Sequence, residues 1–246
     1  MKTKTIDELI KELGIKRIKE KTVTGDQFEE YLKIQARKSI TDNKVLFFLD
    51  TEFTGLEQDA ELISIGITTL VNNKPGPEFY AEITDFNKDK ASDWVKENVF
   101  PGLPFANKKA PYIEFGLGRE NIFEVVEESY DVTIDDAMIK STKKETSNHL
   151  RSFINLFKPL NKSNKIEVWS DCLAYDWVLF CDLLDNNLPD NILYIPFDIC
   201  TVFKMKGIDP DISREAFIGN QVEGYKHNAL YDAIVIKKCF EKLMVI

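Results

Sequence analysis

Three segments with strand-like hydrophobic patterns open the main part of the chain. Residues 45–49 (VLFFL) are a continuous apolar run, and residues 61–68 (ELISIGIT) are rich in β-branched side chains. Residues 72–77 (NNKPGP) are a strong turn signal, and residues 78–83 (EFYAEI) follow as a third strand-like segment. The pattern therefore predicts three consecutive strands joined as an antiparallel meander.

The segments after the meander alternate between helical and strand-like patterns. Helices are predicted near residues 92–99, 145–157, 176–184, 199–205 and 230–244. Short apolar runs predict strands at 166–169 and 193–197. A meander followed by β-α units is the order expected for a mixed sheet flanked by helices, so we predict an α/β fold over residues 45–246.

Two further regions surround or interrupt this predicted domain. Apolar residues recur at helical spacing over 6–20 and 28–36, which predicts an N-terminal helical extension covering residues 1–44. Its helices could pack on the chain's own core or form a face for a partner or a second copy. Residues 104–145 contain prolines, glycines and an acidic run, and are predicted to be an insertion with little helix.

Composition places the protein in the cytoplasm. A membrane span needs about eighteen uninterrupted apolar residues, and no stretch of the sequence comes near that length. The first residues lack the apolar core of a signal peptide. The four cysteines are scattered without a CxxC pair, which disfavours a zinc site and a disulfide framework. We expect all four to be reduced packing residues.

The chain is acidic, with 41 acidic against 32 basic residues and a formal net charge of −9. Tight binding of nucleic acid through an overall basic surface is disfavoured, because such binding draws its affinity from neutralised phosphates. An acidic charge is compatible with an enzyme that gathers carboxylates around metal ions, since the metals supply the positive charge that meets phosphate.

Asp50 and Glu52 are spaced by two residues at the C-terminal end of the first apolar run. Side chains at i and i+2 of a strand project from the same face, so both carboxylates should point to one side of the sheet. Neighbouring oxygen ligands of this kind suit Mg²⁺ or Mn²⁺. The same pair also occurs in solvated turns at strand ends, so a metal site requires further acidic residues.

Two more acidic residues and a histidine stand near the starts of predicted helices. Asp176 follows a strand and a short loop, and capping of the helix N-terminus is its alternative role. His227 precedes Asp232 by five residues, with a helix predicted to begin between them. This spacing lets Asp232 lie inside a site while the imidazole of His227 overhangs it from a loop. The other histidine, His149, is expected to be an ordinary surface residue.

These motifs resemble those of the DEDDh 3′-5′ exonucleases, which share a ribonuclease H-like fold. They are DTE at 50–52, YD at 175–176 and HxxxxD at 227–232. Similarity to the polyadenylate-specific exoribonuclease AS family extends further, into DWVK at 93–96 and PGLP at 101–104. The N-terminal extension and the length of the insertion depart from that family.

The resemblance implies an enzyme that releases 5′-mononucleotides from the 3′ end of single-stranded RNA, as a homodimer. Two Mg²⁺ or Mn²⁺ ions would be held by four carboxylates, those of Asp50, Glu52, Asp176 and Asp232. One ion would activate water and the other would stabilise the leaving 3′ oxygen. His227 would take the proton from that water, as a neutral imidazole can at physiological pH. The closer similarity suggests an adenosine-rich 3′ end.

Four residues beside the motifs are candidates for binding the terminal nucleotides: Phe53, Thr54, Tyr175 and Trp177. Aromatic rings at these positions suit stacking on bases. They equally suit the core, because aromatic residues beside a strand end or a helix start are often packed inside.

Three other functions are compatible with the same residues. A four-acid site does not distinguish sugars, so a 3′-5′ exodeoxyribonuclease acting on single-stranded DNA is the first alternative. The second is a catalytically inactive ribonuclease H-like module that binds nucleic acid, against which the presence of all five side chains argues. The third is a structural metal-binding domain, in which His227 would only pack.

Overall fold

The computed structural model describes residues 44–104, 122–123, 132–133, 137–157 and 165–245. The predicted helices over 6–20 and 28–36, and with them nearly all of the predicted extension (1–44), lie outside the described residues. Most of the predicted insertion (104–145) lies outside them as well. The described residues all belong to one structural unit, residues 39–246.

The first long strands form the antiparallel meander that the sequence predicts. Strand β1 (Val45–Phe53) pairs with β2 (Leu62–Val71), and β2 pairs with β4 (Phe79–Ile83), both antiparallel. The turn at 72–77 contains the two-residue strand β3 (Lys74–Pro75), which pairs with the end of β2.

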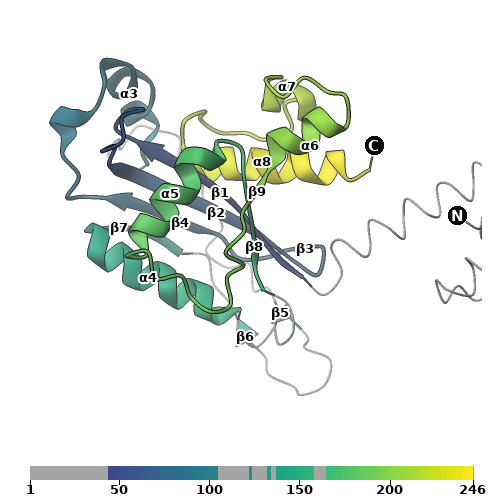
Figure 1. Ribbon diagram of the computed structural model, residues 1–246, viewed down its shortest axis with the longest axis horizontal. Helices are drawn as coiled ribbons and strands as arrows, with labels where there is room; N and C mark the ends of the chain where they lie inside the picture. Colours follow the sequence, from purple (N-terminus) through teal and green to yellow (C-terminus); the bar gives the residue numbers. More distant parts are fainter. Residues whose placement is uncertain (1–43, 105–121, 124–131, 134–136, 158–164, 246) are drawn as a thin grey trace, which may run out of the picture. The chain divides into compact units, whose positions relative to one another are not determined.

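Parallel strands extend the meander on both sides. Strands β8 (Glu167–Ser170) and β9 (Phe197–Asp198) follow β1, each parallel to its neighbour, and β7 (Ala137–Ser141) lies parallel to β4. The order across the sheet is β7-β4-β2-β1-β8-β9 (Figure 1). A separate antiparallel pair consists of β5 (Ile122–Phe123) and β6 (Val132–Thr133). The predicted fold class, a ribonuclease H-like mixed sheet flanked by helices, is confirmed.

Two strands differ from the expectation. The strand predicted at 193–197 begins only at Phe197, after an isolated bridge at Ile192. Pro196 contributes to this shortening, because it has no N–H to donate to a strand ladder. Strand β7 lies within the range predicted as an insertion, 104–145, so that part of the range belongs to the main sheet.

The described helices are α3 (Asp93–Asn98), α4 (Lys143–Leu156), α5 (Leu173–Leu183), α6 (Ile199–Met205), α7 (Arg214–Ile218) and α8 (Ala229–Leu243). Two 3-10 turns, η1 (Lys88–Lys90) and η2 (Phe100–Gly102), flank α3. All five helices that the sequence predicts after the meander are present. Helix α5 begins three residues before its predicted start, and α7 was not predicted. Among the described residues, no helix combines the length and the apolar character needed to cross a membrane.

Side-chain caps set several helix starts. Thr142 and Glu145 form a capping box at α4, in which each side chain accepts a hydrogen bond from the other residue's backbone N–H. Ser92 accepts from the N–H of Val95 at the start of α3. Asn228 accepts from the N–H of Tyr231 at the start of α8. The last of these caps lies next to His227, so the sequence signal for a helix start there was correct.

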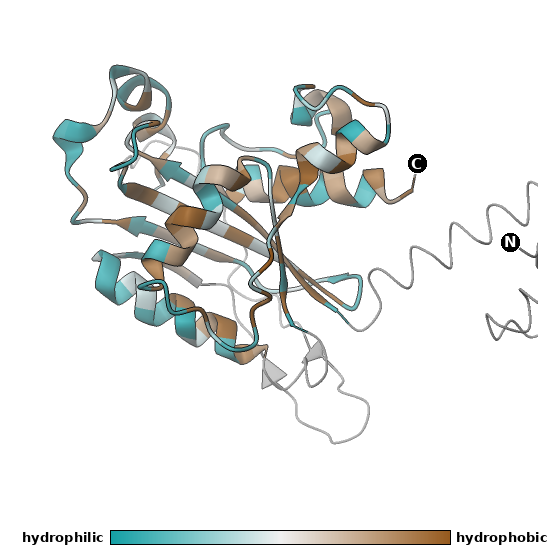
Figure 2. Cartoon of the chain, viewed as in Figure 1, coloured by the Kyte–Doolittle hydropathy of each residue, from teal (hydrophilic) through white to brown (hydrophobic). Residues whose placement is uncertain are grey.

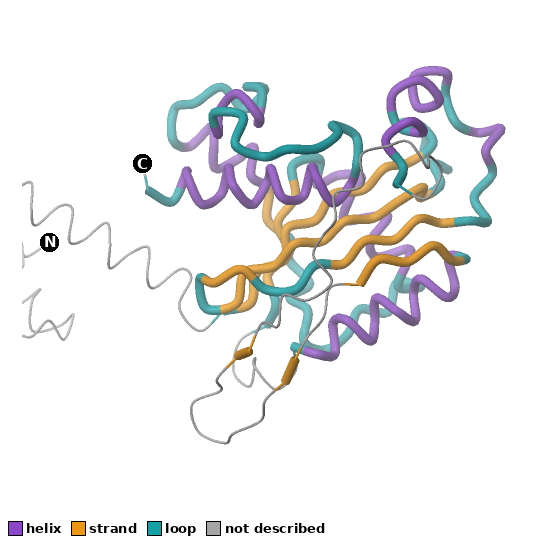
Figure 3. Tube along the Cα trace, turned by 180° about the vertical axis from the view of Figure 1, so that it is seen from behind, coloured by secondary structure: helices purple, strands orange, loops and turns teal. Residues whose placement is uncertain are grey.

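Different helices cover the two faces of the sheet. Phe47 of β1 belongs to the hydrophobic core under α4 and α5, whereas its neighbour Phe48 belongs to the core under α6 and α8. Figure 1 shows α4 and α5 on the near side of the strands, and Figure 3 shows α8 from behind. In Figure 2 the strands carry much brown, which marks hydrophobic residues, whereas α4 carries much teal, which marks hydrophilic ones.

Strand β2 and the start of α8 approach most closely at Gly66. Gly66 pairs with Asp50 in β1 and with Tyr80 in β4, and it faces α8. A Cβ atom on Gly66 would overlap the backbone atoms of Ala229 and Leu230. The first turn of α8 therefore rests directly on the sheet, beside the strand position that carries Asp50.

Replacing Gly66 with alanine should lower the free energy of unfolding by about 1–3 kcal/mol, because backbone atoms of α8 would have to move. Gly55→Ala is a matched control, since its Cβ would meet only the flexible end of Glu57. The control should change stability by less than about 1 kcal/mol. Urea denaturation measures both, and equal losses in the two variants would contradict the close approach.

Candidate functional site

Asp50 and Glu52 lie in the second half of β1, on the face of the sheet that α8 covers. The pairing of β1 with β2 shifts register only after Glu52, so the two acids keep the alternation of a regular strand. Asp50 lies opposite Gly66, against which α8 begins. Glu52 is buried and Asp50 is half-buried. The acid pair therefore points toward the start of α8 instead of lying in a solvated turn.

Asp176 comes from the first turn of α5 and is only 1% exposed. Its Oδ1 accepts hydrogen bonds from the N–H of Thr51 at 3.1 Å and from the Thr51 hydroxyl at 2.6 Å. Its Oδ2 accepts from the hydroxyl of Ser170. The alternative that Asp176 is the N-cap residue is wrong, because Cys172 occupies that position. These bonds instead connect Asp176 to β1 and β8, next to Asp50.

His227 and Asp232 are joined across the start of α8. The backbone N–H of His227 donates to Oδ2 of Asp232 at 2.8 Å, and His227 has a left-handed backbone with φ of 65°. The side chain of Asn228 donates to the carbonyl of Gly102 at 3.2 Å, which connects this turn to η2. Asp232 thus lies in the first turn of the helix while His227 lies in the preceding loop, as the spacing predicts.

The carboxyl groups of the site hold their protons more strongly than ordinary ones. Burial, and then the charges of Asp232 and Asp176, raise the pKa of Glu52 to about 9. Burial also raises the pKa of Asp232 to about 7 and that of Asp176 to about 6. The pKa of Asp50 lies well above its usual range, through burial first and then through the charges of the other three. At neutral pH a nearby positive charge would therefore stabilise the ionised forms of these acids.

The donor set fits a divalent metal ion. Ligand atoms of Glu52, His227 and Asp232 all lie within 4.8 Å of one another. Carboxylate oxygens are the ligands that Mg²⁺ and Mn²⁺ prefer, and a cation would stabilise the ionised carboxylates against their burial and mutual repulsion. The proximity of His227 to Glu52 and Asp232 also makes the imidazole a possible ligand, besides its predicted role as a base.

The acids open into a cavity of about 760 Å³. Four of the five residues predicted from the motifs line it: Asp50, Glu52, His227 and Asp232. Asp176 is not among the described lining residues, because it is buried behind Asp50 against Thr51. The structure therefore brings the five side chains together, four at the surface of the cavity and one behind it.

Two exposed apolar residues that sequence reasoning missed also line the cavity. Trp94 of α3 is 54% exposed and meets the ring of His227 edge-on, with the ring centroids 4.9 Å apart. Leu56, in the loop after β1, is 71% exposed. The similarity noted in residues 93–96 was the available signal for Trp94, and no local pattern distinguished Leu56.

The four residues predicted to bind substrate are placed differently from one another. Phe53 lines the cavity and stacks on Tyr175, with centroids 5.1 Å apart and ring planes 12° apart. The hydroxyl of Tyr175 donates to the carbonyl of Leu56. Thr54 is buried, and its hydroxyl accepts from the N–H of Glu61. Trp177 packs against the core under α4 and α5. Phe53 has access to a ligand, whereas Thr54 and Trp177 have packing contacts.

One wall of the cavity is held by an ion pair that the motifs did not indicate. Arg214 donates to both carboxylate oxygens of Asp171, at 2.8 and 2.7 Å, and lies over the ring of Phe203. Its Nη2 also lies 3.1 Å from the sulfur of Cys200. All four cysteines are free thiols, although Cys172 is exposed and so is not a packing residue as expected.

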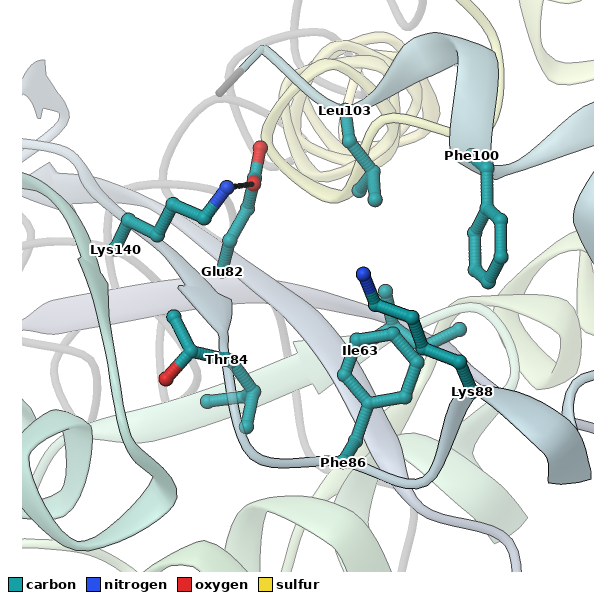
Figure 4. Close-up of a pocket in the computed structure, with 9 residues that line it drawn as sticks. Ile63, Glu82, Thr84, Phe86, Lys88, Phe100, Leu103 and Lys140 are labelled. Atoms are coloured by element: carbon teal, nitrogen blue, oxygen red, sulfur yellow. Dashed lines mark ion pairs between the residues drawn. The ribbon is translucent and has the colours of Figure 1, made fainter. Parts of the chain in front are cut away.

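A second cavity, of about 160 Å³, lacks the features of the first. It lies beside Phe86, Phe100 and Leu103, and Glu82 is its carboxylate (Figure 4). That carboxylate is already paired, with Lys140 at 3.8 Å. The larger cavity is therefore the candidate functional site.

A mixed sheet that carries an acid pair on its first strand, with further acids on flanking helices, is the arrangement that the resemblance to 3′-5′ exonucleases implied. Residues 123–244 match the family model described as the 3′-5′ exoribonuclease Rv2179c-like domain. The matched residues include Asp176, His227 and Asp232, and they begin after Asp50 and Glu52. The resemblance to 3′-5′ exoribonucleases is confirmed by this match and by the relatives.

Two curated relatives from Mycobacterium tuberculosis strains are both named 3′-5′ exoribonucleases. They are 3′-5′ exoribonuclease Rv2179c and 3′-5′ exoribonuclease MT2234.1, each 28% identical over 137 residues. The aligned part is 56% of this chain and 60% of either relative. The chain is thus similar to enzymes named for removing nucleotides from RNA 3′ ends, over about three fifths of their length.

Two solved structures are similar in outline. Cell-death related nuclease 4 aligns with a TM-score of 0.48 and 14% identity, over 82% of this chain and 64% of that chain. The catalytic unit of Neurospora crassa Pan2 aligns with a TM-score of 0.39 and 15% identity, over 82% of this chain and 27% of that chain.

Without metal, stability should fall as pH rises from about 5 to about 9. The folded carboxyl pKa values lie above the ordinary values near 4, so in this window the folded protein binds more protons than the unfolded chain. Loss of those protons therefore destabilises the fold. Melting temperatures in EDTA measure the fall, and Glu52→Gln, which removes a group with a pKa of about 9, should flatten it.

Mg²⁺ or Mn²⁺ added at pH 8 should raise the melting temperature again, because the ions bind the folded carboxylates. A melting temperature at pH 8 that is the same in EDTA and in metal would contradict a preformed acidic site.

Proposed function

We propose that this protein is a metal-dependent 3′-5′ exoribonuclease that removes 5′-mononucleotides from single-stranded RNA. The observation that carries the proposal is the convergence of three carboxyl groups and one imidazole at a single cavity, with a fourth carboxyl group buried directly behind them. They come from β1, α5 and the start of α8, which are far apart in the sequence. Similarity to relatives named 3′-5′ exoribonucleases supports the same activity.

Asp50, Glu52 and Asp232 would hold the divalent ions at the cavity surface, with Asp176 behind them. The ions would supply Lewis-acid stabilisation of charge on the phosphate and a lowered pKa for bound water. The protein's part is to fix the carboxylates. Backbone N–H groups of Thr51 and His227 hold Asp176 and Asp232, and β-sheet pairing holds the strand of Asp50.

His227 would accept a proton from the attacking water through a ring nitrogen. Burial, and then the charge of Lys226, lower the pKa of His227, so the imidazole is neutral and can accept a proton at pH 7. The edge of Trp94 limits the orientations of the ring. The bond from the His227 N–H to Asp232 keeps the backbone close to the carboxylates.

The cavity suits a single-stranded 3′ end. Exposed apolar side chains of Trp94 and Leu56 border the acids and offer a surface for unpaired bases. A net charge of −9 disfavours tight binding of a long duplex, which draws its affinity from neutralised phosphates. The names of the relatives support RNA over DNA, and the similarity to the exoribonuclease AS family supports an adenosine-rich end.

A nuclease assay with 5′-labelled, single-stranded RNA and DNA of matched sequence tests the substrate. We expect stepwise shortening of RNA from its 3′ end in Mn²⁺, loss of activity in EDTA, and slower cleavage of DNA. Asp50→Asn should abolish cleavage while leaving the melting temperature in EDTA at least as high, because a repelled charge is removed. Faster cleavage of DNA would favour the exodeoxyribonuclease, and no cleavage of either would favour a binding module.

His227→Ala should lower kcat by about 10²- to 10⁴-fold, the usual contribution of a general base. Calorimetric titration with Mn²⁺ should show nearly unchanged metal affinity, since the carboxylates remain. His149→Ala, which removes the exposed histidine of α4, serves as the control and should retain full activity. A collapse of metal affinity in His227→Ala would instead make His227 a ligand.

A further inference from the structure

Two cationic side chains, Arg214 and Lys226, are among the described residues that line the large cavity. The guanidinium of Arg214 is already occupied, with two bonds to Asp171 and further bonds to the carbonyls of Ile212 and Pro210. Its side chain is 13% exposed. Arg214 therefore builds the wall of the cavity, and most of its donors are committed to protein groups.

Lys226 is placed very differently. Its side chain is 62% exposed, and its Nζ lies 3.4 Å from Oε1 of Glu215. The pair contributes only modestly to stability, because the Lys226 ammonium stays hydrated, although the Glu215 side chain is only 19% exposed. The ammonium can therefore exchange Glu215 for another anion at small cost. Glu215 is also held by the Ser213 hydroxyl, so it remains in place when Lys226 leaves.

The backbone around Lys226 is held by hydrogen bonds, although the Lys226 side chain is exposed. The N–H of Asn228 donates to the carbonyl of Tyr225, which closes a tight turn around Lys226 and His227. The N–H of His227 is bonded to Asp232. The ammonium of Lys226 thus reaches from a fixed point directly beside the proposed general base.

We propose that Lys226 binds a backbone phosphate of the nucleic-acid substrate, exchanging Glu215 for that phosphate when the strand enters. This inference rests on the proposed nuclease function. A protein with a net charge of −9 needs local cations to bind the negatively charged backbone of a nucleic acid. Among the described residues that line the cavity, Lys226 is the exposed cation. A lysine acts as a point charge and reads no base, so it should add affinity for every sequence alike.

Steady-state cleavage of a 5′-labelled oligoadenylate at several salt concentrations tests the proposal. Lys226→Gln should raise KM roughly ten-fold and change kcat by less than about three-fold, as for lost binding that is shared by ground and transition states. The slope of log(kcat/KM) against log[salt] should become shallower by about 0.7, the value for one phosphate contact on a single strand. Lys226→Arg, which keeps the charge, should restore most of both.

Lys238→Gln is the matched control. Lys238 is an exposed lysine with one carboxylate partner, Glu241, and it lies about 15 Å along α8 from the helix start. This variant should keep the KM and the salt slope of the wild type. If Lys226→Gln behaves like it, or lowers kcat with KM unchanged, the phosphate contact is wrong. A wild-type protein that cleaves neither RNA nor DNA would overturn the nuclease function as well.

Glu215→Gln tests the exchange of partners. Freed from Glu215, Lys226 should bind phosphate more readily, so KM should fall about two- to three-fold, in line with the small energy of an exposed pair. In the double variant, Glu215→Gln should have no further effect on KM beyond that of Lys226→Gln. A fall in KM that persists without Lys226 would show that Glu215 repels the substrate directly, and would overturn the exchange.

Discussion

Burying several carboxyl groups beside one another is unfavourable, and the arrangement of the described fold offsets that cost. Each acid is fixed by a rigid part of the backbone: Asp50 and Glu52 by the pairing of β1, and Asp232 by the N–H of His227. Asp176 is held by Thr51 and Ser170 from two neighbouring strands. The hydrophobic cores on both faces of the sheet keep these strands in place. The raised carboxyl pKa values express first the burial of the acids and then the repulsion between them, and both favour taking up a cation.

One face of the sheet packs the core under α4 and α5, and the opposite face carries the acids Asp50 and Glu52. From Val45 to Leu49, the side chains of β1 that point toward α4 and α5 are apolar and give the strand its position. Those that point toward α8 change from apolar, at Phe48, to acidic, at Asp50 and Glu52. Since α8 begins on Gly66, directly beside Asp50, the same contact that completes the core also delivers Asp232 and His227. The packing of α8 on β2 therefore also places Asp232 and His227 beside Asp50.

Local patterns in the sequence were enough for the parts of the site that depend on local geometry. Strand alternation placed Asp50 and Glu52 on one face, and the cap before α8 separated His227 from Asp232. The contacts of Trp94 with His227 and of Arg214 with Asp171 could not be predicted, because they join distant segments with no periodic signal. Helix α7 and strand β9 are too short to leave a clear pattern. The burial of Thr54 and the packing of Trp177 against the core likewise depend on tertiary structure.

The contact between Gly66 and the start of α8 has a consequence during protein synthesis. Chains emerge from the ribosome from the N-terminal side, so β1 and β2 are available well before α8. A nascent chain at that stage carries Asp50 and Glu52 but neither Asp232 nor His227. The full set of acids exists only after α8 has been made and has settled on β2. The complete acidic site therefore forms only after every strand of the described main sheet has been made.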